Sequence, residues 1–179
     1  MRDIRFCLAI VLCILSIPAM AQSPSLPEQQ QKFLSIIDDF AEKYKSAKNE
    51  MAQGALRVQR AKAICDLFQS PGVKDWVGTV QKVSSDNEGK GVLNVSMSKI
   101  ANATTWNNAL SDIGDKTLIE PGTPLHDAAI QLNRNDIITF SGTFVKGDKD
   151  CFRESSLTQR GSMTDPDWIF RFSSVKPAQ

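Results

Sequence analysis

Histidine is the first residue to consider, because most acid–base and nucleophilic catalysis in proteins uses it. The chain has one histidine, His126, so a Ser-His-Asp or Cys-His system would have to use it. The sequence has no G-x-S-x-G, HExxH, P-loop or G-x-G-x-x-G segment. We therefore expect a non-enzymatic protein with no catalytic residue, no metal ligand and no cofactor.

Pairs of carboxylates are the next candidates, because two carboxylates can hydrolyse a glycosidic bond. Close pairs occur at Asp38/Asp39, Asp148/Asp150 and Asp165/Asp167. Charged turns produce the same spacing more often than active sites do. The segment 148–150 also lacks the remaining ligands of a calcium loop. These pairs predict no catalysis.

Binding residues are predicted on the strands and in one loop. The candidates are polar or aromatic side chains expected at the surface: Lys82, Trp106, Asn107, Arg153, Glu154 and Arg171. An exposed tryptophan near arginine can stack on a base, a sugar or a partner side chain. Core packing of Trp106 and surface ion pairing of Arg153 and Arg171 are the alternatives.

Two cysteines, Cys65 and Cys151, follow the N-terminal segment. In an exported protein, two cysteines favour one disulfide bond. The alternatives are a metal pair or two free thiols, and one distant histidine makes a poor metal set. The bond requires the two Cα atoms to lie within about 7 Å of each other.

The first 21 residues have the features of a secretory signal peptide. Arg2 and Arg5 give a positive start, an apolar run covers residues 6–17, and residues 19–21 (AMA) form a small-x-small cleavage site. The run is short for a bilayer-spanning helix, which makes an uncleaved anchor the weaker alternative. We expect a periplasmic or secreted protein with no membrane span after cleavage.

The charge balance limits the possible partners. Removal of residues 1–21 leaves equal numbers of basic and acidic side chains. Nucleic-acid binders usually carry a basic excess, because phosphate neutralisation supplies most of their affinity. The balance disfavours nucleic acid as a partner, although a local basic patch stays open.

Residues 22–72 form a helical segment in the predicted organisation. Ser25 and Glu28 fit a capping box at the start of a helix over 26–69. Apolar or small residues then follow at alternating steps of four and three, which is a heptad pattern: Phe33, Ile37, Phe40, Tyr44, Ala47, Met51, Gly54, Val58, Ala61, Cys65 and Phe68.

This heptad seam allows two arrangements. The helix either breaks near Gly54 into a hairpin that packs on its own domain, or continues and projects. A projecting helix predicts a homo-oligomer through residues 33–68. The small residues Ala47, Gly54 and Ala61 would allow close approach of a second helix.

Residues 73–179 are rich in predicted strands. We expect strands over 75–84, 92–98, 104–108, 136–145 and 167–175, a possible edge strand over 155–159, and a helix over 123–132. Gly78 predicts a bulge or bend in the first strand. Trp76 and Trp168 are expected in the core.

Three strands, a helix and two strands resemble the OB-fold, a five-stranded Greek-key barrel. Residues 132–142 (LNRNDIITFSG) are similar to the L-x-x-G-D-x-V-x-x-x-G entry into the fourth strand of many OB domains. Asn135 stands in place of the usual glycine, and asparagine tolerates positive φ. The fold class predicted is α+β: an OB-like barrel preceded by a long helix or helical hairpin.

Three functional hypotheses follow. The first is an exported binding module for a protein or envelope component. The second is binding of single-stranded nucleic acid or oligosaccharide by the barrel face, as the OB resemblance implies. The third is a structural or assembly protein that oligomerises through its N-terminal helix.

Overall fold

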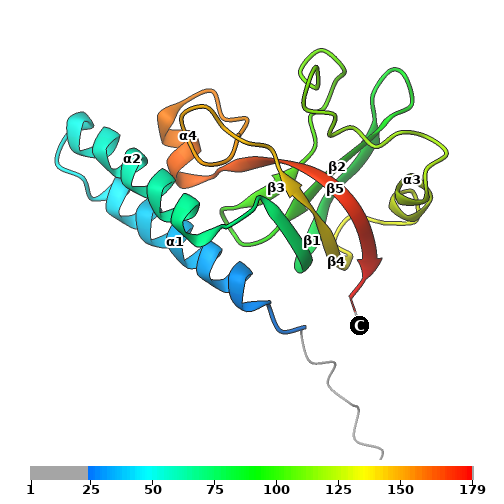
Figure 1. The fold of residues 1–179 in the computed structure, drawn as a ribbon, viewed down its shortest axis with the longest axis horizontal. Coiled ribbons are helices and arrows are strands. Elements are labelled where there is room, and N and C mark those ends of the chain that lie inside the picture. The colour runs from blue at the N-terminus through cyan, green and yellow to red at the C-terminus, as the bar shows by residue number, and fades with distance from the viewer. Residues whose placement is uncertain (1–23, 179) are drawn as a thin grey trace, which may run out of the picture.

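The computed structural model describes residues 24–178, in which a helical hairpin stands beside a β-barrel (Figure 1). The predicted signal peptide lies outside these residues. The elements are α1 (Glu28–Lys45), α2 (Glu50–Leu67), β1 (Gly72–Ser85), β2 (Gly91–Ser96), β3 (Asn102–Thr104), α3 (Pro124–Ala129), β4 (Ile137–Phe144), α4 (Gln159–Thr164) and β5 (Asp167–Pro177). No helix within 24–178 is long and apolar enough to cross a membrane.

The five strands close into a barrel in the order β1-β2-β3-β5-β4, and β4 pairs back to β1. Strands β3 and β5 are parallel, whereas the other neighbours are antiparallel. This order, with α3 between β3 and β4, agrees with an OB-like topology. The predicted α+β fold class is confirmed.

Two residues allow local backbone features that the barrel requires, a close approach of two strands and a tight turn before β4. A Cβ on Gly78 would lie 2.5 Å from Val95 Cγ1, so only glycine lets β1 approach β2 this closely. The register of the two strands then shifts between Val80 and Lys82. Asn135 has φ 75°, which confirms the expected left-handed turn before β4.

The helical segment is a hairpin, but the predicted break at Gly54 is wrong. The chain turns at residues 46–49, and Gly54 lies inside α2. Asn49 caps α2 by accepting a hydrogen bond from the backbone N–H of Ala52 at 2.9 Å. A good cap outweighs the modest cost of an internal glycine. The predicted cap at Ser25 is also wrong, because α1 begins after Pro27 without a side-chain cap.

The heptad seam divides between the two helices. On α1, Phe33 is fully buried, and its ring centroid lies 5.4 Å from those of Trp76 and Phe144. On α2, Met51 is 88% exposed and Val58 is 70% exposed. The α1 half of the seam is therefore used to dock the hairpin onto the barrel.

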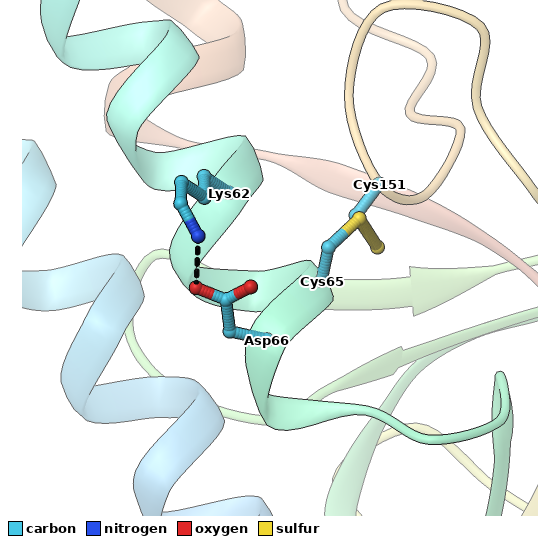
Figure 2. Close-up of a disulfide and its surroundings, with 4 residues drawn as sticks. All are labelled: Lys62, Cys65, Asp66 and Cys151. Atoms are coloured by element: carbon cyan, nitrogen blue, oxygen red, sulfur yellow. Dashed lines mark hydrogen bonds and ion pairs between the residues drawn. A yellow bond between two sulfur atoms is a disulfide. The ribbon is translucent and has the colours of Figure 1, made fainter.

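A buried amide and a disulfide bond help to hold the hairpin on the barrel. The buried Gln30 side chain accepts from the N–H of Val77 at 2.8 Å and donates to its carbonyl at 2.5 Å. The predicted disulfide joins Cys65 on α2 to Cys151, with Cα atoms 5.3 Å apart (Figure 2).

The remaining differences concern short elements. The third strand covers 102–104 instead of 104–108. The possible edge strand over 155–159 is wrong, because Thr158 instead caps α4 by accepting from the N–H of Gly161. The expected helix over 123–132 is confirmed with Thr123 as its cap, but it ends earlier, at Ala129. Trp76 and Trp168 are buried in the core as expected.

Candidate functional site

Three of the predicted binding residues contact Asp115, two through its buried carboxylate and one through its backbone carbonyl. The indole N–H of Trp106 donates to Asp115 Oδ2 at 2.8 Å. Arg153 donates from Nη1 to both carboxylate oxygens, at 2.8 and 2.7 Å. The guanidinium of Arg171 donates to the backbone carbonyls of Asp115 and Lys116. The tryptophan and both arginines are therefore held within the protein by this one residue.

These contacts fix the 106–118 loop, which belongs to the long connection between β3 and α3. In Figure 1 this connection rises above the barrel before it turns toward α3. Asp112 orders the loop from inside. Its carboxylate accepts from the N–H and hydroxyl of Thr117 and from the N–H of Leu118. Connections of this length are uncommon in compact domains and are usually functional or disordered.

The tip of the ordered loop presents two aliphatic side chains to solvent. Leu110 is 79% exposed and Ile113 is 74% exposed. The backbone after them takes positive φ at Gly114 (86°) and at Lys116 (50°). Positive φ is uncommon for a residue such as lysine, and such strain collects at functional sites.

Lys82 lies elsewhere, in a polar groove on the barrel face. Strands β1, β2, β3 and β5 and the turn after β2 form this groove, whose lining is Gln81, Lys82, Asn94, Ser96, Lys99, Asn102 and Asp167. The volume is about 580 Å³. The lining contains amides, hydroxyls and charges but no aromatic ring on which a base or sugar could stack.

Glu154 lies beside a third group of charges, between α2 and the 146–158 segment. Arg57 donates to Asp150 Oδ2 at 2.5 Å, and the fully buried Arg60 lies 3.7 Å from the same carboxylate. Hydrogen bonding to Asp150 raises the pKa of Arg57, whereas burial lowers the pKa of Arg60. Arg60 also stacks on Trp168, with its guanidinium carbon 5.2 Å from the ring centroid. This cluster fixes the hairpin to the barrel.

The remaining predicted positions are distributed as follows. Asn107 is exposed, and its side-chain oxygen accepts a hydrogen bond from the neighbouring Asn108 and not from the barrel. His126 lies in α3, and its ring lines a separate small cavity with Ile119 and Ala129. Within residues 24–178, no three His, Cys, Asp or Glu side chains are grouped so as to hold a metal ion.

Sequence reasoning missed the two residues that build the loop. Asp112 and Asp115 are ordinary acidic residues in a polar stretch, and their partners Arg153 and Arg171 are far along the chain. Only the spacing of aspartate, threonine and glycine around Leu110 and Ile113 signals an ordered loop. The convergence of the arginines depends on tertiary structure.

Comparison with family models, curated proteins and solved structures gives no significant match. The architecture therefore defines the class: an α+β protein whose closed five-stranded barrel carries a disulfide-linked helical hairpin. Its most distinctive surface feature is the 106–118 loop.

Proposed function

We propose that the protein is an exported, non-enzymatic binding module that engages a partner protein through the 106–118 loop. One observation carries the proposal. The fold fixes this loop through the buried Asp115 and yet leaves Leu110 and Ile113 exposed at its tip.

The energetic argument rests on pre-organisation. Exposed aliphatic side chains are common, but a flexible loop that carries them loses conformational entropy on binding. Here that entropy has already been lost on folding, since hydrogen bonds from Arg153 and Trp106 hold the loop. Rigid apolar anchors are what a binding hot spot requires.

The tip also defines the chemistry of the partner. Asn107, Asn108 and Ser111 are close to the two aliphatic residues in sequence and carry no charge, and the nearest exposed charge in the loop is Lys116. The carboxylates of Asp112 and Asp115 are used by hydrogen bonds within the protein. The expected partner site is an apolar pocket with a largely uncharged polar rim, and one exposed lysine at the edge should leave binding only weakly dependent on salt.

The alternatives have less support. The barrel-face groove contains Lys82 and Lys99 beside Asp167, so its positive charge is small, and its lining offers no aromatic ring. Assembly through residues 33–68 has less support because the α1 half of the seam is buried against the barrel. Only exposed residues of α2, such as Met51 and Val58, are left to contact a second copy. Export is part of the proposal and is supported by the disulfide and the apolar run over 6–17.

Site-specific photo-crosslinking in the producing cells tests the proposal. A photoreactive residue at position 110 or 113 should give an adduct with a discrete protein. The same group at Asn87, in the exposed β1–β2 turn, should not give that adduct. Identical adducts from all three positions, or none from 110 and 113, would contradict the proposed docking loop.

A further inference from the structure

A cavity lies beside the disulfide, at the end of α2 and remote in sequence from the 106–118 loop. Its volume is about 510 Å³, within the range of small-molecule sites. Ala61, Phe68, Pro71 and Phe152 provide apolar walls, and the Cys65–Cys151 bond borders them. Figure 2 shows how α2 and the loop that carries Cys151 are joined here.

The rim of this cavity is basic. Lys62, Lys146 and Lys149 lie around it. Lys62 is engaged with Asp66 at 2.7 Å, whereas no ion pair found among residues 24–178 includes Lys146 or Lys149.

The acids on the same rim do not cancel this charge. Asp150 forms an ion pair with Arg57, and the Asp150 side chain is only 5% exposed. Asp148 is 93% exposed and lies 3.9 Å from Arg153, which offsets part of its charge. An apolar interior with free ammonium groups at its edge therefore complements an amphipathic anion.

We propose that this cavity binds a monomeric long-chain carboxylate. The alkyl chain packs against Phe68, Phe152 and the disulfide, and the carboxylate meets Lys146 and Lys149. The proposal is independent of the docking loop, because none of the residues that line the cavity belongs to residues 106–118.

Fluorescence titration of the oxidised protein with 11-(dansylamino)undecanoic acid is the first test. We expect saturable binding that dodecanoate displaces. Decanoate, with two fewer methylene groups, should displace the probe about tenfold less well. Dodecyltrimethylammonium should not displace it. The absence of saturable binding, or equal displacement by the cation, would overturn the proposal.

Variants locate the site. Ala61→Trp fills the cavity and should abolish probe binding, while Val58→Trp, almost one helical turn away on exposed α2 surface, should leave it unchanged. Lys146→Glu with Lys149→Glu should weaken dodecanoate about tenfold. Circular dichroism and the melting temperature establish that each variant is folded. Unchanged binding in a folded Ala61→Trp protein would overturn the site.

Two further measurements distinguish the cavity from a membrane surface and from the 106–118 loop. Flotation with phosphatidylcholine/phosphatidylglycerol vesicles should leave the protein unbound; vesicle binding that dodecanoate does not inhibit would instead indicate a membrane contact and overturn the proposal. Leu110→Ser with Ile113→Ser should keep full dodecanoate binding. Loss of binding in that variant would place the carboxylate at the loop and overturn the assignment to the cavity.

Discussion

The carboxylate of Asp115 accepts two hydrogen bonds from Arg153, which is 38 positions further along the chain. The same carboxylate accepts from the indole of Trp106. A loop and the segment after β4 are thereby joined through one buried acid. Because charge-assisted hydrogen bonds are about twice as strong as neutral ones, this contact is a strong restraint on the loop.

Asp115→Asn should destabilise the protein by about 2 to 3 kcal/mol, because it removes the charge that pairs with Arg153. Urea unfolding measures this loss, and trypsin cleavage after Lys116 reports local release of the loop. The matched control is Asp148→Asn, whose side chain is 93% exposed and should change stability by less than about 0.5 kcal/mol. Equal stability of the two variants would contradict the assigned role of Asp115.

Gly54→Ala should stabilise the protein by about 0.5 to 1 kcal/mol. The glycine lies inside α2, and an added Cβ would meet nothing within 4 Å. Gly142→Ala is the matched opposite case, because its Cβ would fall on the carbonyl of Arg171 and should destabilise strongly. Thermal unfolding compares the two. A destabilised Gly54→Ala protein would show that the chain bends at Gly54 after all.

Removal of the disulfide by Cys65→Ser with Cys151→Ser should cost about 4 to 5 kcal/mol. The bond closes a loop of 86 positions, so the chain-entropy model predicts a large effect on the unfolded state. Urea unfolding of the double variant and of the reduced natural chain should give similar midpoints. A loss below about 1 kcal/mol would mean that the noncovalent contacts of Gln30, Phe33 and the two arginines of α2 hold the hairpin in place without the bond.

The sequence predicted the barrel well because strands and glycines leave local signals. Gly78 marks a close approach of two strands and Asn135 a left-handed backbone conformation, and the structure bears out both. The heptad pattern identified Phe33 as an interior residue. It could not distinguish packing on the barrel from packing on a second helix, since both bury the same face.

The site was harder to predict. The sequence singled out Trp106, Arg153 and Arg171 separately, but their common partner Asp115 follows from tertiary structure alone. Gln30 and Arg60 are polar residues that the fold buries completely. A pattern based on hydrophobicity assigns such residues to the surface. Burial of a polar group becomes favourable only when the tertiary fold supplies its hydrogen-bond partners, which the local sequence does not show.

The most direct test of the docking loop is calorimetric titration of the crosslinked partner, once purified, against three forms of the protein. The natural chain should bind. Leu110→Ser with Ile113→Ser should lose at least tenfold in affinity with an unchanged melting temperature, because both side chains are exposed. Lys82→Glu with Lys99→Glu should bind like the natural chain. Full binding by the loop variant, with loss in the lysine variant, would contradict the account and place the partner in the barrel-face groove.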